Sequence, residues 1–245
     1  MKLYTPLLGI LIIFNACKKD IQPATSVVNF SFTTYETLGA FDQYGGPLYL
    51  QNPDVISPEL TSFINKTLPE HTDLRKTNPG LLSAQSTADI AITRSSDVFI
   101  TLVEKGTAYP DAIGFYTFPT GSAPDSVKDI KKITYIFPFV GWGSTVSPGD
   151  KVKIGKFEAG TSVGFVLLQG AYDKVTGKLN TSVPHFLSND ALNPELDKNL
   201  KKHAVLVDYS SSSEQKVLIG FEDIDRTESA CDHDFNDVVL YATIK

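Results

Sequence analysis

Cysteine and basic charge are both scarce in this chain. Two cysteines, Cys17 and Cys231, allow at most one internal disulfide, which excludes a small scaffold held together by several bridges. The 22 Lys and Arg residues face 28 Asp and Glu residues, for a net charge of −6, and they form no basic run. We therefore expect no nucleic-acid partner, because proteins that bind nucleic acid gather Lys and Arg on one face.

The chain also lacks a hydrophobic run long enough to span a bilayer. The apolar stretch over residues 3–14 is shorter than the roughly 20 residues that a spanning helix needs, and Ala16-Cys17 ends it. This pattern predicts a lipoprotein signal peptide over residues 1–16, cleaved before Cys17. A diacylated Cys17 would anchor the protein in the outer membrane through a tether over residues 17–26, on the surface or the periplasmic face. The alternative is a buried N-terminal helix with an incidental cysteine.

If Cys17 carries the lipid, Cys231 is a lone thiol. It stands directly before a run of acidic residues, and neighbouring carboxylates suppress the thiolate by raising the pKa of the thiol. We therefore interpret Cys231 as an inert small residue, with a redox or metal-binding role as the alternative.

The remaining sequence favours an all-β fold. A single helix is predicted near the start, because Ser57-Pro58-Glu59 offers an N-cap, a proline at the first helical position and an acid in the first turn. It should end near Pro69. Short β-branched and aromatic runs follow at intervals of roughly ten residues, the spacing of a sandwich or barrel.

These runs predict strands at residues 27–32, 88–93, 98–104, 113–118, 133–137, 151–157, 162–168, 203–208, 216–221 and 236–244. The polar stretch over residues 171–202 is too long for a tight turn, so we expect an excursion over the rim. We predict an antiparallel β-sandwich, jelly-roll-like, over residues 97–245, preceded by an N-terminal segment with a short helix over residues 27–96.

The most informative motif lies in the last thirty residues. Glu222-Asp223 closes one apolar run, and Asp232-His233-Asp234-Phe235-Asn236-Asp237 opens the next. Carboxylates brought so close repel one another and lose hydration, so they need a cation, a dense set of donors, or protonation. Oxygen ligands favour Ca²⁺. The predicted metal ligands are Glu222, Asp223, Asp232, Asp234, Asn236 and Asp237.

Strand geometry refines this prediction. If the segment is extended, Asp232, Asp234 and Asn236 lie on one side, and Asp237 lies opposite unless a bulge turns it inward. The alternative to a metal is a set of Asx-turns and caps, since Asp and Asn bond local backbone well. A metal is favoured because turn chemistry needs one or two such residues, not six.

The same residues carry a family resemblance. The motif from Glu222-Asp223 to Asp237-Val238-Val239 resembles the C-terminal signature of the domain of unknown function 4114, which is found in bacterial surface proteins such as LruC-type lipoproteins. Upstream segments, including residues 98–106 and 113–116, are similar as well. The resemblance implies a β-sandwich with a Ca²⁺ site and no catalytic activity. The chain departs from the pattern at residues 226–231, which replace a glycine-rich turn, and at Asp111, where Asn is more usual.

Two further readings concern ligands. Glu222 and Asp234 could act as the acid and base of a glycoside hydrolase, which is the alternative function. The sequence contains no Gly-x-Ser-x-Gly elbow and no His-Glu-x-x-His motif, so a non-enzymatic protein is predicted. Gly141-Trp142-Gly143 places the only Trp in a turn, where its ring could contact a glycan or a surface protein, or else pack into the core.

We therefore predict a lipid-anchored protein of the outer membrane or cell surface with a structural Ca²⁺ site. It would serve as an adhesion module, or as a module that binds a glycan or another partner.

Overall fold

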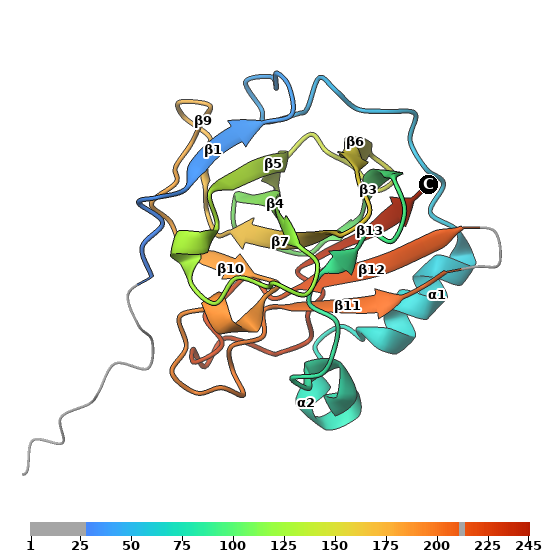
Figure 1. The fold of residues 1–245 in the computed structure, drawn as a ribbon, viewed down its shortest axis with the longest axis vertical. Helices are drawn as coiled ribbons and strands as arrows, with labels where there is room; N and C mark the ends of the chain where they lie inside the picture. Colours follow the sequence, from blue (N-terminus) through green and yellow to red (C-terminus); the bar gives the residue numbers. More distant parts are fainter. Residues whose placement is uncertain (1–27, 211–213) are drawn as a thin grey trace, which may run out of the picture.

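The computed structural model describes residues 28–210 and 214–245 (Figure 1). The predicted signal peptide over residues 1–16, the lipidation site Cys17, the tether over residues 17–26 and Val27 lie outside the described residues. Among those described, no helix combines the length and the apolar character that crossing a bilayer requires.

Two mainly antiparallel sheets form the sandwich, and a separate two-stranded sheet, β8 (Tyr172–Asp173) with β9 (Lys178–Leu179), lies outside them. The first sheet has the order β1 (Thr34–Thr37), β5 (Lys132–Val140), β4 (Asp111–Pro119), β7 (Thr161–Leu168) and β10 (His185–Leu187), and β2 (Ile90–Ala91) also pairs with β7. The second has the order β11 (Ala204–Asp208), β12 (Gln215–Phe221), β13 (Val238–Ile244), β3 (Ser96–Lys105) and β6 (Lys151–Phe157). Only β1, which pairs with β5, runs parallel to its neighbour among the described strands. The predicted all-β sandwich is confirmed.

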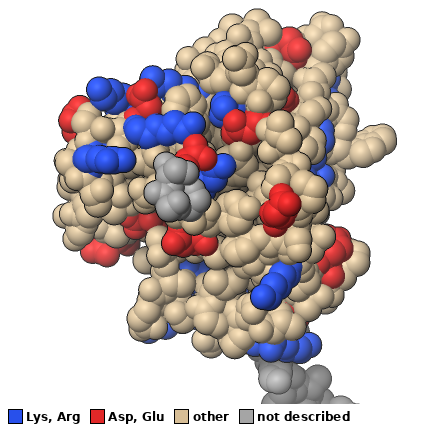
Figure 2. Space-filling view, turned by 90° about the vertical axis from the view of Figure 1, so that its right-hand side faces the viewer, with Lys and Arg blue, Asp and Glu red and all other residues tan. Residues whose placement is uncertain are grey.

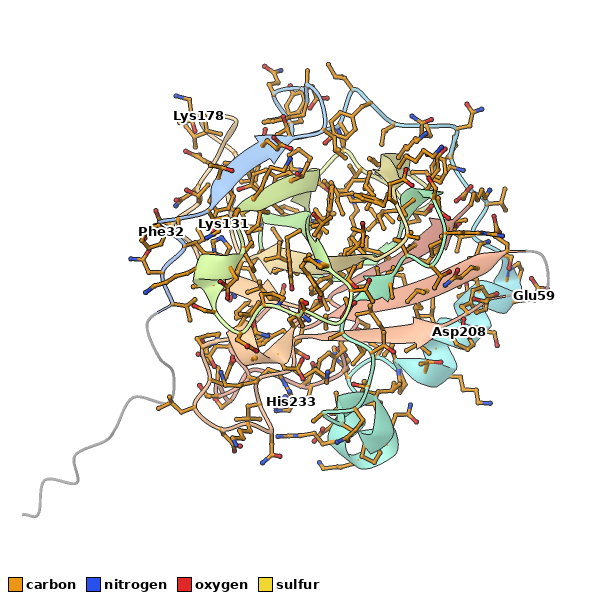
Figure 3. The ribbon with its side chains drawn as sticks, viewed as in Figure 1. Phe32, Glu59, Lys131, Lys178, Asp208 and His233 are labelled. Atoms are coloured by element: carbon orange, nitrogen blue, oxygen red, sulfur yellow. The ribbon has the colours of Figure 1, made fainter. Side chains whose placement is uncertain are left out.

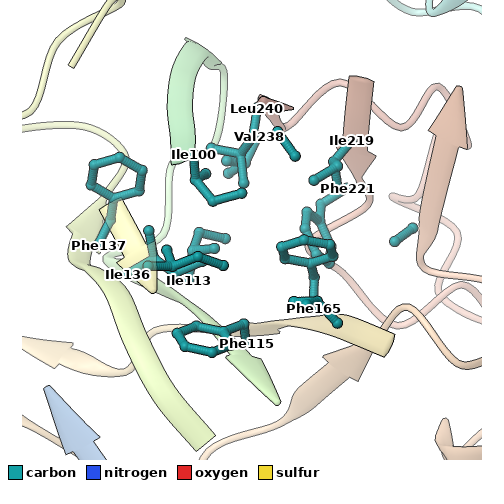
Figure 4. Packing of buried hydrophobic residues seen from close by; sticks show 14 of the residues in the cluster. Ile100, Ile113, Phe115, Ile136, Phe137, Phe165, Ile219, Phe221, Val238 and Leu240 are labelled. Atoms are coloured by element: carbon teal, nitrogen blue, oxygen red, sulfur yellow. The ribbon is translucent and has the colours of Figure 1, made fainter. Parts of the chain in front are cut away.

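The main core fills the space between the sheets. Apolar side chains from alternate positions of both sheets meet there, as the period of two along a strand requires. Figure 4 shows Ile113, Phe115 and Phe165 of the first sheet facing Ile219 and Phe221 of the second. This packing holds the ends of β4, β12 and β13 in fixed positions at the acidic motif.

The predicted helix is confirmed as α1 (Pro58–Thr67). Ser57 is its N-cap, and the Ser57 hydroxyl accepts a hydrogen bond from Leu60 N at 3.2 Å. Leu60 and Ile64 pack against the outer face of the second sheet, in a cluster that includes Tyr241. Figure 1 shows α1 beside β11 and β12. The short helices α2 (Leu74–Thr77) and η1 (Pro79–Leu82) follow and were not predicted.

Most predicted strands are confirmed, several with the same bounds to within two residues. The first is wrong in its described part, because residues 28–33 contain no strand and β1 begins at Thr34. The turn before it has local causes: Ser31 N donates to Asn29 Oδ1 at 2.8 Å, and Thr33 N donates to Phe30 O at 2.9 Å. β1 and β2 join the first sheet, so residues 28–96 contribute to the sandwich itself.

The excursion over residues 171–202 is partly structured. It contains the hairpin of β8 (Tyr172–Asp173) and β9 (Lys178–Leu179), the edge strand β10 and the 3-10 helix η3 (Asp190–Leu192). The remaining 3-10 helix, η2 (Val127–Asp129), lies between β4 and β5. Asn193 fixes its course, because the Asn193 carboxamide accepts from Leu187 N at 2.7 Å and donates to Leu187 O at 2.8 Å. One side chain thus takes the place of a neighbouring strand at this position.

Charges of both signs are interspersed on the face shown in Figure 2. The edge strand β6 contributes Lys151 and Lys153, which pair with Asp54 and Asp97 respectively. Lysines on an edge strand oppose pairing with another chain, so this edge is protected against aggregation.

Candidate metal centre

The acidic motif does not continue β13 as an extended segment. β13 begins at Val238, and the backbone of His233 (φ 64°) and Phe235 (φ 62°) lies in the left-handed region. Phe235 is buried, and its carbonyl oxygen lies 2.3 Å from the position that a Cβ on Gly220 would occupy. The kink therefore depends on Gly220 having no side chain. The predicted alternation of residues 232, 234 and 236 along a strand is wrong for this reason.

The kink divides the predicted ligands between two groups. Asp223 and Asp237 lie with Asp111 at the start of β4, and we call these three the Asp111 group. Glu222, Asp232 and Asp234 each place a carboxylate oxygen within 4.8 Å of the others, and we call these three the Asp234 group.

Hydrogen bonds fix the Asp111 group in place. Thr107 Oγ1 donates to Asp111 Oδ2 at 2.9 Å, and Gly170 N donates to Asp111 Oδ1 at 2.7 Å. Asp223 N donates to Asp237 Oδ2 at 2.9 Å. Four segments thus converge on these carboxylates: the loop between β3 and β4, the end of β7, the end of β12 and the start of β13.

Within residues 28–210 and 214–245, no side chain supplies a counter-charge to the Asp111 group. Asp111 is fully buried and Asp223 is 5% exposed, and no Lys or Arg among the described residues forms an ion pair with either of them or with Asp237. Asp223 Oδ2 is buried without a hydrogen-bond partner in the described part of the chain. An unpaired buried carboxylate oxygen costs free energy, so it indicates a missing partner.

The pKa values of this group reflect the same situation. Burial, and then the charge of Asp223, raises the pKa of Asp111 to about 8. Burial, followed by the charges of Asp223 and Glu222, raises the pKa of Asp237 to about 9. Burial also raises the pKa of Asp223. All three shifts have the same direction, so in the absence of a cation the folded protein favours the protonated forms of these carboxyl groups.

The Asp234 group is satisfied by donors of the chain. Glu222 Oε1 accepts from Cys231 Sγ at 3.2 Å, and Glu222 Oε2 accepts from Phe235 N at 3.4 Å. Asp234 Oδ2 accepts from His71 N at 2.8 Å, and Asp234 Oδ1 accepts from Asn236 N at 3.2 Å. Burial raises the pKa of Glu222 to about 7 and that of Asp234 to about 6.

A buried cation also lies beside the Asp234 group. Arg226 is 2% exposed, its guanidinium lies 4.9 Å from the ring centroid of Phe235, and it donates to Lys202 O at 2.8 Å. Burial lowers the pKa of Arg226, and the charge of Glu222 opposes this shift. Figure 3 places His233, which accepts from Arg226 Nε at 3.2 Å, in the loops between the lower strands and α2.

Two exposed residues, Glu70 and His71, lie beside the Asp234 group. His71 Nδ1 lies 3.1 Å from Asp232 Oδ2, and His71 Nε2 lies 3.3 Å from Glu70 Oε1. Glu70, His71 and Asp234 also place ligand atoms within 4.8 Å of one another. The sequence pattern did not indicate Glu70 or His71, because they are some 160 residues from the motif and their contacts with it arise only through the turn after α1.

The other residues singled out in the motif have structural contacts. Asn236 Nδ2 donates to Leu68 O at 3.3 Å, at the C-cap of α1. Cys231 is buried, and burial raises the pKa of its thiol well above the ordinary value. A protonated, enclosed thiol agrees with the interpretation of Cys231 as unreactive.

Trp142 lies on the surface. Its side chain is 81% exposed, so it is not part of the core. Gly141 (φ 114°) and Gly143 (φ 87°) give the turn its shape, and a Cβ on Gly141 would lie 2.1 Å from Tyr109 O. Trp142 N donates to Thr107 O at 3.3 Å, so the turn is attached to the loop that also bonds Asp111.

Comparison with known families identifies the region that carries the motif. Residues 157–245 match the family model described as Domain of unknown function (DUF4114). The C-terminal part of this chain is a DUF4114 domain. The DUF4114 domain holds β7 and β10 of the first sheet, β11, β12 and β13 of the second, and the whole acidic motif. Searches of curated proteins and of solved structures found no match.

Thr107 and Asp111 precede the DUF4114 match. The Asp111 group therefore joins two carboxylates of the DUF4114 domain to one from the preceding part of the sandwich. In the sequence, Asp111 stands out only as a departure from the family pattern. Asp111 could have been added to the predicted ligands on the ground that it begins a strand, β4, whose first residues lie beside the end of β7.

Proposed function

We propose that this protein is a lipid-anchored β-sandwich of the outer membrane or cell surface, in which Ca²⁺ bound by the Asp111 group acts as a structural ion. The protein would present its loops to a glycan or to another surface protein. The observation that carries the metal assignment is Asp223 Oδ2, a buried carboxylate oxygen that has no hydrogen-bond partner among the described residues and lies beside two other carboxylates.

The donor atoms of the Asp111 group are of the kind that calcium prefers, although among the described residues it is the Asp234 group that places three carboxylate oxygens within 4.8 Å of one another. Asp111, Asp223 and Asp237 would hold it, and they offer only oxygen atoms. Ca²⁺ accepts about six to eight oxygens in flexible geometry, with water and carbonyl oxygens completing the shell. When bound, the ion would neutralise carboxylates that otherwise need protons. It would connect β4 to the loop between β12 and β13, and so brace one end of the two sheets against each other.

The buried positions of the acids favour a structural role over glycoside hydrolysis. Glu222 and Asp234 are each 1% exposed, and their oxygens accept hydrogen bonds from backbone or thiol groups. A glycosidase needs its acid and base on the wall of an open cleft, on either side of the sugar linkage. We therefore propose a binding protein without catalytic activity.

The anchor rests on the sequence of residues 1–17. A diacylated Cys17 would place the sandwich at the membrane after a short tether, since two acyl chains hold stably where one binds reversibly. Labelled fatty acid should be incorporated into the full chain and lost in Cys17→Ser. Equal labelling of both would contradict the anchor.

Calorimetric titration of Ca²⁺ into chelator-treated protein lacking residues 1–19, with melting curves, tests the metal centre. We expect saturable binding and a higher melting temperature. Asp111→Asn together with Asp223→Asn should abolish both, because two of the three charged ligands are lost while the side-chain shape is kept. Asp208→Asn, at an exposed carboxylate on β11, is the matched control. A wild-type melting curve that is the same in Ca²⁺ and in chelator would refute the proposal.

A further inference from the structure

A groove on the rim of the sandwich is formed by two segments that are far apart in sequence. It has a volume of about 450 Å³ and lies between the loop containing Asp42 and Tyr44 and the turn of the β8–β9 hairpin, which contributes Lys174 and Thr176. Tyr172 OH donates to Gln43 O at 2.8 Å, which ties the hairpin to that loop.

The Trp142 turn adjoins this groove. Lys174 Nζ donates to Trp142 O at 2.9 Å and lies 5.7 Å from the centroid of the Trp142 ring. It also lies 5.1 Å from the centroid of the Phe139 ring. Lys174 is thus shared between the groove and the exposed indole, so the two form one continuous surface.

Local hydrogen bonds shape the groove in advance. Asp42 Oδ1 accepts from Tyr44 N and from Gly46 N, each at 2.8 Å, which closes the loop. Asp173 caps the hairpin turn, accepting from Val175 N at 2.8 Å and from Thr176 Oγ1 at 2.7 Å. Little conformational freedom remains to be lost when a ligand binds.

Two aromatic rings are left exposed on this surface. Trp142 is 81% exposed and Tyr44 is 58% exposed, although each could bury a large apolar area. Exposed rings of this size beside a shaped groove are typical of a contact site for a ligand that combines apolar and polar faces.

The charged side chains of the groove, Asp42 and Lys174, indicate the chemical class of the ligand. Asp42 supplies a carboxylate whose Oδ2 receives no hydrogen bond from the described residues, and Lys174 supplies a cation. These two opposite charges balance, so the groove favours neither an anion nor a cation. A hydroxyl group donates to a carboxylate and accepts from an ammonium group, so paired hydroxyls match both.

We propose that this rim binds a neutral saccharide, with Trp142 and Tyr44 stacking on the apolar faces of sugar rings and with Asp42 and Lys174 bonding their hydroxyls. This inference deepens the proposed function, since it names the ligand class and the site of the surface module. It does not require Ca²⁺, because none of these four residues belongs to the Asp111 group.

An array of neutral and acidic oligosaccharides, probed with the protein lacking residues 1–19, is the first test. We expect binding to neutral glycans. Trp142 is the only Trp, so its fluorescence should change when a bound oligosaccharide is added. Trp142→Ala and Asp42→Asn should each weaken binding by about tenfold or more. Phe32→Ala, which removes an exposed ring outside this groove, should leave binding unchanged.

Three outcomes would overturn the inference: a blank array for the wild type, binding confined to acidic glycans, or equal binding by Trp142→Ala. Melting temperatures of the variants should equal that of the wild type, which excludes unfolding as the cause of a loss. The array is run in Ca²⁺ and in chelator. If no glycan binds but calcium does, only the proposal of saccharide binding at the rim is refuted. If a glycan binds but calcium does not, only the proposal of a calcium site in the Asp111 group is refuted.

Discussion

Two groups of carboxylates lie at the same end of this sandwich, but only one has its charge balanced by the protein. The Asp234 group has backbone donors, the Cys231 thiol and the buried guanidinium of Arg226 nearby. The Asp111 group has an unpartnered oxygen and no ion pair within the described residues. The comparison teaches that the number of acids does not identify a metal centre; the balance of charge and donors around them does.

The largest expected effect is on the pH dependence of stability. The folded-state pKa values of Asp111 (about 8) and Asp237 (about 9) lie above the ordinary value of 3.8, so the folded state favours their protonated forms. In chelator, these groups contribute most to the free energy of unfolding below about pH 4. That contribution, on the order of several kcal/mol, should be lost as the pH rises through their raised folded-state pKa values. Ca²⁺ should remove this loss, because it replaces the protons.

Urea unfolding at about pH 5 and about pH 9, with Ca²⁺ and with chelator, measures this difference. The Asp111→Asn, Asp223→Asn variant is the control, and its stability should depend less on pH. If the wild type in chelator is equally stable at both pH values, the negative charge of the Asp111 group must already be compensated within the protein, which contradicts the prediction.

The second effect concerns the internal cation of the Asp234 group. Arg226→Met should lower the free energy of unfolding by about 3 kcal/mol, because it removes the buried positive charge beside Glu222 and leaves only the half-exposed Arg75 to interact with that carboxylate. Arg75→Met removes a half-exposed guanidinium paired with Asp73 and should cost about 1 kcal/mol or less. Urea unfolding compares the two. Equal losses would mean that Arg226 has no special role beside the Asp234 group.

The strands and the first helix could be predicted from the sequence, but the division of the acidic motif could not. Hydrophobic alternation located the strands from 98–104 onward, and Ser57-Pro58 located the start of α1, because these signals are local. The motif was correctly identified as acidic and closely packed. Its division into two groups could not be predicted, since it follows from left-handed backbone at His233 and Phe235, residues that rarely adopt it.

Two other features were beyond local patterns. Asp111 meets Asp223 and Asp237 only because β4 packs across the sandwich from the β12–β13 connection, and no spacing in the sequence records that contact. The course of residues 187–201 depends on one carboxamide, that of Asn193, which a polar stretch does not distinguish from its neighbours.

The smallest expected effect sharpens the comparison. Asp232 is half-exposed in the Asp234 group, so Asp232→Asn should change the free energy of unfolding by less than about 0.5 kcal/mol. Its calcium affinity should stay within about threefold of the wild type, as calorimetric titration would measure. Loss of calcium binding in this variant would assign the ion to the Asp234 group and reverse the comparison.

The position of β13 in the second sheet governs when that sheet can form. β13 (Val238–Ile244) lies between β12 and β3, and it pairs with residues of β3 that precede it by some 140 positions. During synthesis from the N-terminal end, β3 and β6 therefore wait for residues 238–244 before their sheet is complete. Until residues 238–244 have been made, the second sheet lacks its central strand, and the core between the two sheets stays open.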